Sequence, residues 1–219
     1  MLKICTSEQE WKAERLNYLT ASDAANYCNC NPFDSFGLVR LWEEKTGLKA
    51  RPDISSKENV LFGKSAEEHL RALFLLMHPE FYSEYNQFGL YISEERPYMA
   101  ATLDDLLHNR ETGETEILEI KTASVRNGEA LRAWRQGEIP VNYWCQELHQ
   151  LYCVPEASGV WTFAHVRAEW IPDESWLIQV HHRRDEQDVS DDMPWLLEQA
   201  DDMNRRIESR QRPATTIRL

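Results

Sequence analysis

The stretch that most constrains the fold is an apolar run over residues 115–122 that carries Glu119 and Lys121. Residues two apart in a strand point to the same face, so this carboxylate and this ammonium would share one side of a strand that otherwise reads as buried. Unpaired buried charge is costly, so the pair needs a partner. Asp104, upstream at the end of another apolar stretch, can reach the same place. A divalent metal ion held by these acids beside the lysine would supply the missing charge.

Length and composition suit one α/β domain. The chain has 219 residues with 8 Trp and 8 Tyr, enough for a sizeable core, and we expect a single domain over residues 1–219. It contains no apolar run long enough to span a membrane. The first residues lack the layout of a secretory signal, and the 5 cysteines form no tight disulfide framework, so we expect a cytoplasmic protein.

The overall charge argues against nucleic-acid binding when it is taken alone. The chain carries 24 Lys and Arg against 37 Asp and Glu, a net charge of −13, whereas nucleic-acid-binding proteins usually present a basic surface. Many of the acids lie over residues 185–202, which read as a solvated helix face. A local basic patch elsewhere is enough to bind phosphates. Composition therefore leaves open a DNA-binding enzyme and a non-catalytic acidic protein that mimics DNA or binds partners.

Hydrophobic periodicity predicts a mixture of helices and strands. Asn109 to Gly113 has turn chemistry, which places Asp104 and Glu119 on neighbouring strands of a hairpin. A short helix is expected to begin either at Thr20, with Asp23 three residues on, or at Ser22, since Thr and Ser are typical N-cap residues. The expected helices cover residues 11–19, 36–46, 61–77, 129–137, 141–153 and 188–210, and the expected strands cover 82–86, 88–92, 98–104, 115–122, 160–166 and 176–181.

The helix expected over residues 61–77 offers one more acid to an interior site. On a helical wheel Glu67 falls at the edge of the apolar stripe, whereas Glu68 points away from it. His69 lies on the apolar face and is expected to be a core histidine rather than a ligand. Glu67 is therefore the carboxylate that can join Asp104 and Glu119.

Polar residues also form a stripe on the helix expected over residues 141–153. Gln146, His149 and Gln150 fall opposite the apolar stripe of that helix. Such a stripe is usually solvated. Alternatively, the two long amides lie behind the acids and position a water molecule or a phosphate.

The acids and the lysine together suggest a hydrolytic chemistry. Asp104, Glu119 and Glu67 are hard oxygen donors, which suit Mg²⁺ or Mn²⁺ better than zinc. Lys121 beside them can polarise or orient a water molecule. With one or two metal ions such a set hydrolyses phosphodiesters. The pattern is short, so ordinary surface ion pairs remain an alternative on spacing alone.

Arg15 and Ser22 form a second candidate site. A helix that begins at Ser22 presents free backbone N–H groups and a favourable dipole, and with Arg15 nearby it can hold a phosphate. The alternative is a plain N-cap beside a surface arginine. Spacing alone favours the plain N-cap.

Several short motifs follow one another along the chain. They are Trp11, Arg15 and Thr20-Ala21-Ser22, then Phe62-Gly63-Lys64-Ser65-Ala66-Glu67, Ala101-Thr102-Leu103-Asp104, Leu118-Glu119-Ile120-Lys121, and Tyr143-Trp144-Cys145-Gln146. Their order resembles the lambda-exonuclease family, also called YqaJ-like viral recombinases, within the PD-(D/E)xK nucleases. The resemblance runs from about Trp11 to Tyr152.

This resemblance implies a restriction-endonuclease-like fold, in which helices flank a central mixed β-sheet. It implies a Mg²⁺-dependent, processive 5′-to-3′ exonuclease that acts on linear double-stranded DNA and leaves 3′ single-stranded overhangs. It further implies a ring-shaped homotrimer that threads DNA. The expected partner is a single-strand annealing protein, in phage or prophage recombination within a bacterial host.

The resemblance also implies roles for individual residues. The Mg²⁺ ligands would be Asp104, Glu119 and the backbone carbonyl of Ile120, with Glu67 as an outer acid. Lys121 would be the catalytic lysine, and Gln146 would position water or substrate. The pocket for the 5′-phosphate and nearby DNA would include Arg15, Ser22, Thr102 and Arg126.

Two departures from the family pattern bear on the site. Asp105 stands where the family usually has glycine after the metal-binding Asp, and Leu148 stands where it has a second glutamine. Neither change removes a proposed ligand or the lysine, so we expect an active enzyme. An endonuclease of the same fold, cutting at restriction sites or junctions, is the alternative enzyme.

Overall fold

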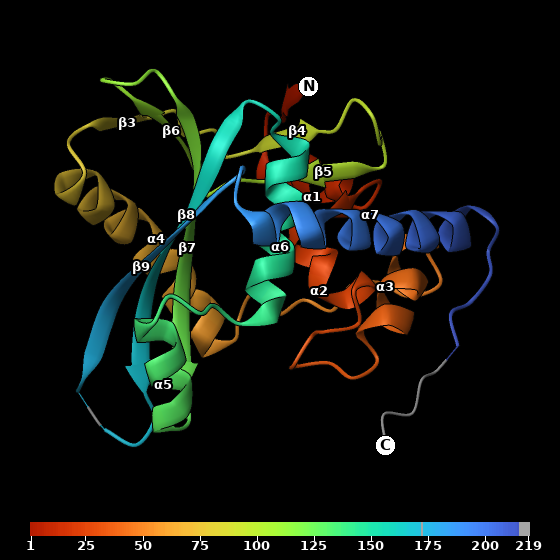
Figure 1. The fold of residues 1–219 in the computed structure, drawn as a ribbon. Coiled ribbons are helices and arrows are strands. Elements are labelled where there is room, and N and C mark those ends of the chain that lie inside the picture. Colours follow the sequence, from red (N-terminus) through yellow and green to blue (C-terminus); the bar gives the residue numbers. More distant parts are fainter. Residues whose placement is uncertain (172, 215–219) are drawn as a thin grey trace.

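The computed structural model describes residues 1–171 and 173–214. The larger of its two sheets contains the strand that carries Glu119 and Lys121. That sheet is mixed, because β7 and β8 run parallel while the other pairs are antiparallel (Figure 1). Its order is β3 (Phe81–Ser83), β6 (Asp105–Asn109), β7 (Thr115–Val125), β8 (Ala157–Ala168) and β9 (Ser175–Arg183).

A second, smaller sheet lies beside the first. Its order is β1 (Leu2–Ile4), β4 (Gly89–Ile92), β5 (Met99–Ala101) and β2 (Leu19–Thr20). The mixed α/β architecture confirms the predicted fold class, but the sequence analysis expected one central sheet. β4 and β5 lie within expected strands, but β1 and β2, of three and two residues, are too short to show a reliable alternation and were not predicted.

Helices cover both faces of the larger sheet (Figure 1). Leu70 and Phe74 of α4 pack against Leu118 and Phe163 on one face. Leu148 of α6 belongs to the core on the other face. The helices are α1 (Glu8–Arg15), α2 (Ala24–Tyr27), α3 (Gly37–Lys45), α4 (Glu58–Met77), α5 (Gly128–Arg135), α6 (Val141–Cys153) and α7 (Gln187–Glu208), with a short 3₁₀ helix over Ala21–Asp23.

The alternation along β7 follows the predicted pattern. Leu118 and Ile120 pack into the core beneath α4. Ile117 belongs to the core beneath α6, and Glu119 and Lys121 share that side, as the period of a strand requires. The prediction that the carboxylate and the ammonium lie on one face is therefore confirmed.

The predicted strand over residues 98–104 was wrong in one important way. Only Met99–Ala101 form a strand, in the smaller sheet, and the strand that pairs with β7 begins at Asp105. Asp104 thus lies in the link between the two sheets, directly before β6. It is still a neighbour of β7, because Asp105 is opposite Leu118 in the hairpin register.

Other predictions need smaller corrections. The first helix ends at Arg15 rather than near residue 19, because Leu19 and Thr20 pair with β5 as a strand. The helix α4 begins at Glu58. His69 is exposed and not a core residue.

Within residues 1–171 and 173–214, no helix combines the length and the apolar character that a membrane span requires. A single domain over residues 1–219 stays a prediction.

Candidate active site

The candidate active site lies at the part of β7 that extends beyond its pairing with β6. β6 pairs with β7 only as far as Leu118, and beyond that residue no strand of the described chain covers this edge of β7. The side chain of Asp104 takes the place of the missing strand, because its Oδ2 accepts a hydrogen bond from the Ile120 N–H at 2.7 Å. The N–H and C=O of one strand residue point to the same side, so the Ile120 carbonyl faces the same open edge.

Glu119 and Lys121 are fixed by amides from α6. The Lys121 ammonium lies 2.5 Å from Glu119 Oε1 and donates to Gln146 Oε1 at 2.8 Å. Gln146 Nε2 donates to the same Glu119 oxygen at 2.6 Å, and Gln150 Nε2 donates to Glu119 Oε2. Of the two interpretations of the polar stripe on α6, the one in which the amides lie behind the acids is confirmed. Gln150 is fully buried here.

Gln150 also explains the departure at residue 148. Leu148 is buried in the core and its side chain does not belong to the polar network. The amide that reaches Glu119 comes from Gln150 instead, four residues after Gln146 and therefore one helical turn along the same face. His149, between them in sequence, turns the other way. Its ring nitrogens contact Tyr27 Oη at 2.8 Å and the Ala100 carbonyl at 3.0 Å.

Glu67 and Asp105 are linked by Arg71, which was not identified from the sequence. Arg71 donates to Glu67 Oε1 at 2.8 Å and to the Asp104 main-chain carbonyl at 3.1 Å. Its Nε also lies 3.6 Å from Asp105 Oδ2. Asp105 is buried, and it accepts from Ser83 Oγ at 2.5 Å and from the Leu106 N–H at 2.8 Å. Asp105 therefore helps to hold the Arg71 side chain, which in turn holds Glu67.

The backbone at Asp105 has no positive φ, so this position does not require glycine. The departure from the family pattern thus leaves the turn intact and adds a partner for Arg71. It does not add a carboxylate beside Glu119, because both oxygens of Asp105 face Ser83, Leu106 and Arg71.

The acids Asp104, Glu119 and Glu67 are here called the acid cluster, and their arrangement disfavours the ionised forms of Asp104 and Glu67. Burial and then the nearby charges of Glu119 and Glu67 raise the pKa of Asp104 well above its usual value. Burial also raises the pKa of Glu67, against the lowering effect of Arg71. Burial alone would lower the pKa of Lys121, but the contact with Glu119 raises it, so this side chain carries its charge at neutral pH. The acid cluster is short of positive charge.

The donors at the open edge fit a magnesium or manganese ion. No group of three His, Cys, Asp or Glu side chains in the described chain is arranged to hold a metal on its own. Asp104, Glu119 and the Ile120 carbonyl nevertheless supply oxygen donors at one place, and Mg²⁺ commonly takes one or two carboxylates and keeps several waters. Glu119 accepts three hydrogen bonds, which leaves about one of its four acceptor positions for a ligand bond. Glu67, bound to Arg71, fits the place of an outer acid.

The structure also brings Arg15 and Ser22 together. A terminal nitrogen of Arg15 donates to Ser22 Oγ at 2.7 Å, and the guanidinium carbon lies 4.4 Å from the centroid of the Trp11 ring. The Nε of Arg15 is buried and has no hydrogen-bond partner in the structure. A buried donor without a partner is costly, so this nitrogen is ready to bind an acceptor from a ligand.

Thr102 and Arg126 differ in how they relate to these groups. The hydroxyl of Thr102 is buried and has no partner in the structure, and Gln150 Nε2 lies 3.4 Å from its main-chain carbonyl. Thr102 therefore lies beside the acid cluster with a free hydroxyl. The side chain of Arg126 is 83% exposed, and its nearest acid is Glu169 at 3.6 Å. The structure does not bring Arg126 to the acid cluster or to Arg15.

The ion cluster beneath Ser22 was missed by the sequence analysis. Asp23 was recognised only as part of a helix start, and its carboxylate does accept from the Thr20 N–H at 3.1 Å. It is also fully buried and pairs with Lys45 and Arg51. These cations come from distant parts of the sequence, so no local spacing could have signalled the cluster.

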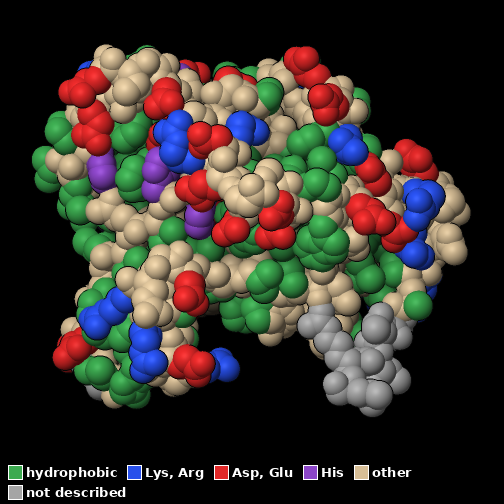
Figure 2. Space-filling model, in the orientation of Figure 1, with side chains coloured by type: hydrophobic (Ala, Val, Ile, Leu, Met, Phe, Trp, Pro, Cys, Tyr) green, Lys and Arg blue, Asp and Glu red, His purple; other side chains and the backbone are tan. Residues whose placement is uncertain are grey.

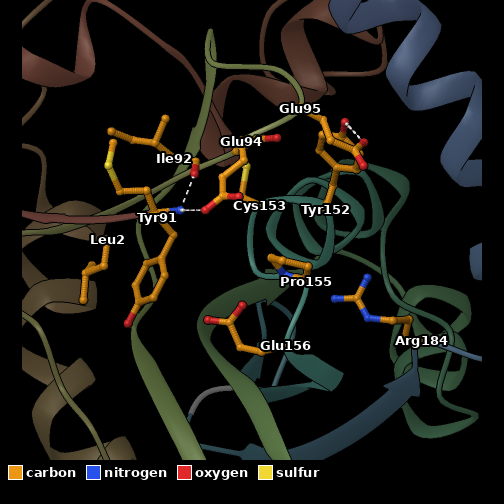
Figure 3. A pocket seen from close by; sticks show the side chains of 12 residues that line it. Leu2, Tyr91, Ile92, Glu94, Glu95, Tyr152, Cys153, Pro155, Glu156 and Arg184 are labelled. Atoms are coloured by element: carbon orange, nitrogen blue, oxygen red, sulfur yellow. Dashed lines mark hydrogen bonds and ion pairs between the residues drawn. The ribbon is translucent and has the colours of Figure 1, made fainter.

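A separate hollow lies away from both groups. It has a volume of about 600 Å³ and is bordered by β4, the end of α6 and Arg184 (Figure 3). Arg184 donates to the carbonyls of Leu151 and Val154 at the C-terminus of α6, where a cation is favourable. The other charged side chains that border the hollow are acidic, Glu94, Glu95 and Glu156, so it has no evident part in phosphate chemistry.

Acidic and basic side chains are interspersed on the face seen in Figure 2, and the lobe at the lower left, where α5 lies, shows both kinds. The helix α5 carries Glu129 in its first turn and Arg132 and Arg135 in its last. A net charge of −13 therefore coexists with basic side chains on this part of the surface.

Comparison with known proteins places this geometry in a family. A sequence model of the YqaJ-like viral recombinase domain matches residues 10–160. No curated protein matches the chain. Among solved structures, LHK-Exo in complex with dAMP shares 18% sequence identity, with a TM-score of 0.63 over 93% of this chain and 96% of that one.

A second structure of LHK-Exo, an alkaline exonuclease from Laribacter hongkongensis, has 16% identity and a TM-score of 0.63, over 92% of this chain and 93% of its own. At such low identity these likenesses establish a shared fold. The match over residues 10–160 spans most of the chain and includes Asp104, Glu119 and Lys121. The chain belongs to the YqaJ-like viral recombinase family, and this membership supports its assignment as a deoxyribonuclease.

Proposed function

We propose that the protein is a Mg²⁺-dependent 5′-to-3′ exonuclease that degrades one strand of linear double-stranded DNA and leaves 3′ single-stranded overhangs. The observation that carries the proposal is the open edge of β7, where Asp104, Glu119 and the Ile120 carbonyl converge beside a charged lysine. The family membership and the fold shared with an alkaline exonuclease support it.

Each side chain at the edge has a definable task in this reaction. Lys121 stays protonated, so it acts as a hydrogen-bond donor and a positive charge rather than as a base. Held by Glu119 and Gln146, it can orient the attacking water and offset charge on the phosphate. A bound Mg²⁺ would promote ionisation of that water and stabilise the leaving oxygen. Gln146 and Gln150 hold the Glu119 carboxylate in the orientation that ligation requires.

Recognition of the 5′ end falls to residues outside the acid cluster. Arg15 supplies a charged donor with an unsatisfied Nε, and Ser22 supplies an exposed hydroxyl beside it. Thr102 adds a hydroxyl without a partner close to the acids. A terminal phosphate bound by this set would direct cleavage toward the strand that begins there. The exposed Arg126, directly after β7, is expected to contact the DNA backbone.

The family assignment supports a place in recombination. We propose that the protein works with a single-strand annealing protein, because a 3′ overhang is the substrate such a partner needs. We also propose that it acts as a homotrimeric ring around DNA, in a bacterial cytoplasm and encoded by a phage or prophage. Solution scattering or analytical ultracentrifugation tests the trimer directly.

The strand polarity can be tested with one substrate. A linear duplex with 5′-phosphates, labelled at the 3′ end of one strand in one sample and at the 5′ end in another, is incubated with Mg²⁺. We expect the 5′ label to appear at once in mononucleotides, while long 3′-labelled strands persist. The opposite order would refute the proposed polarity. Covalently closed circular DNA serves as the control, and its digestion would point to the endonuclease alternative.

A further inference from the structure

A buried ion cluster lies directly beneath the proposed 5′-phosphate site. Asp23 is fully buried at the end of the 3₁₀ helix that carries Ser22. Its Oδ2 lies 3.0 Å from the Lys45 ammonium, and its Oδ1 pairs with Arg51. The side chain of Lys45 is only 3% exposed. Arg15, Lys45 and Arg51 around Asp23 are called the cation cluster below.

Lys45 contacts two main-chain carbonyls in addition to Asp23. Its ammonium also donates to the main-chain carbonyl of Arg15 at 3.0 Å and to the carbonyl of Tyr18. These carbonyls lie at and just beyond the C-terminus of α1, where the helix dipole favours a cation. All three donors of the ammonium are thus used, two on the segment that carries Arg15 and one on the helix that carries Ser22.

The cation cluster carries more positive than negative charge. Asp23 faces Lys45 and Arg51, and these cations together with the Thr20 N–H lower its pKa against the raising effect of burial. Arg51 shares its charge with Glu44, at 2.9 Å, but Arg15 has no acid within ion-pair distance in the described chain. Burial lowers the pKa of Arg15, against the raising effect of the charge on Asp23. An anion beside Arg15 and Ser22 would restore the balance.

We propose that Lys45 is a positioning residue for the 5′-phosphate: it sets the separation of Arg15 and Ser22 by joining the end of α1 to the 3₁₀ helix. The inference rests on the proposed function, since it assigns Lys45 to the same 5′-end site. Arg15 and Ser22 lie on different elements, so their 2.7 Å contact depends on how those elements are joined. Lys45 itself is buried and does not touch the phosphate.

The test is the ratio of initial rates on 5′-phosphoryl and 5′-hydroxyl ends of the same linear duplex. A partly unfolded preparation lowers both rates equally, so the ratio does not respond to a loss of active protein. We expect Lys45→Met to lower the ratio by about tenfold, the effect of losing one charged hydrogen bond to the phosphate. An unchanged ratio would overturn the inference. If Lys45→Met does not fold, Lys45→Gln, which keeps one donor but no charge, gives the same comparison.

Lys49, four residues after Lys45 in the sequence, offers a matched control. Its side chain is 66% exposed and pairs with Glu43 at 2.6 Å. Lys49→Met removes the same charge from the chain as Lys45→Met. We expect the control to keep the rate ratio of the unaltered protein. An equal fall in both variants would mean that net charge, and not the position of Lys45, determines the preference.

A double variant shows whether Lys45 acts through Arg15. In Arg15→Ala the ratio should fall, and adding Lys45→Met should lower it no further, because the group being positioned is already gone. Additive losses would show that Lys45 acts independently and would overturn the positioning role.

If the unaltered protein shows no preference for 5′-phosphoryl ends, the proposed 5′-end recognition itself fails. If Arg15→Ala loses the preference and Lys45→Met keeps it, only the inference about Lys45 fails.

Discussion

The two buried charge clusters of this protein are unbalanced in opposite directions. In the acid cluster, burial and mutual repulsion raise the pKa of Asp104. In the cation cluster, neighbouring cations lower the pKa of Asp23 even though it is fully buried. Both are carboxylates in the interior, and the surrounding charges give them opposite protonation tendencies.

The contrast identifies what each cluster is built to bind. Carboxylates that raise one another's pKa are relieved by a divalent cation, whereas surplus cations with an unsatisfied donor are relieved by an anion. A phosphodiester with a terminal phosphate and a metal ion would satisfy both. The helix α6 contacts the surroundings of both clusters. Its Gln150 donates to Glu119 of the acid cluster, and its His149 contacts Tyr27, four residues after Asp23 of the cation cluster.

The largest effect is expected from removing the one ammonium in direct contact with Glu119. Lys121→Ala should lower the rate of duplex hydrolysis by about 10²- to 10⁴-fold, because the water and the phosphate lose their charged donor. Binding of the duplex should survive, since other residues are proposed to contact the DNA backbone. Rates from single-turnover assays and affinities from fluorescence anisotropy at one salt concentration measure the two quantities. Full activity in this variant would refute the assignment of Lys121.

A pair of isosteric substitutions tests the contrast in stability. Asp23→Asn leaves Lys45 and Arg51 without their carboxylate and should lower the free energy of unfolding by about 3 kcal/mol. Asp104→Asn removes a repelled charge and should leave that free energy unchanged or raise it by about 1 kcal/mol. Urea unfolding at neutral pH, with a chelator present, measures both. Equal losses in the two variants would mean that the two clusters are not opposites.

The smallest effect concerns His149, between the clusters. Burial lowers its pKa to about 4, so at pH 5 it takes up a proton in the unfolded chain but not in the fold. The unfolded state then binds more protons, and stability falls as pH drops from 7 toward 4. Between pH 7 and pH 5 the unaltered protein should lose about 2 kcal/mol more than His149→Gln. Urea unfolding at the two pH values checks this, and identical losses would contradict the buried neutral histidine.

Much of the acid cluster was predictable because its residues follow local rules. The period of a strand put Glu119 and Lys121 on one face, and the helical wheel separated Glu67 from Glu68. Both depend only on neighbours in sequence. The ordered motifs then placed Asp104 beside them, although the strand assigned to Asp104 was wrong.

The remainder was not predictable because it depends on long-range pairing. Lys45 and Arg51 meet Asp23 only after α3 and the loop beyond it fold back onto the 3₁₀ helix. The smaller sheet consists of short strands that are specified by their partners. The helical wheel did not decide whether Gln150 is solvated or lies behind the acids, since a wheel shows which residues share a face but not what that face packs against.

The uncovered edge of β7 has a consequence for how the protein avoids self-association. An exposed strand edge offers free N–H and C=O groups to any passing strand and is a template for aggregation. Here the Asp104 carboxylate occupies the Ile120 N–H, and the acids and Lys121 bring charge to the same edge. The residues proposed for catalysis therefore also protect the edge. Apolar replacements at Asp104 would remove activity and this protection together, so such variants are expected to be the ones that precipitate.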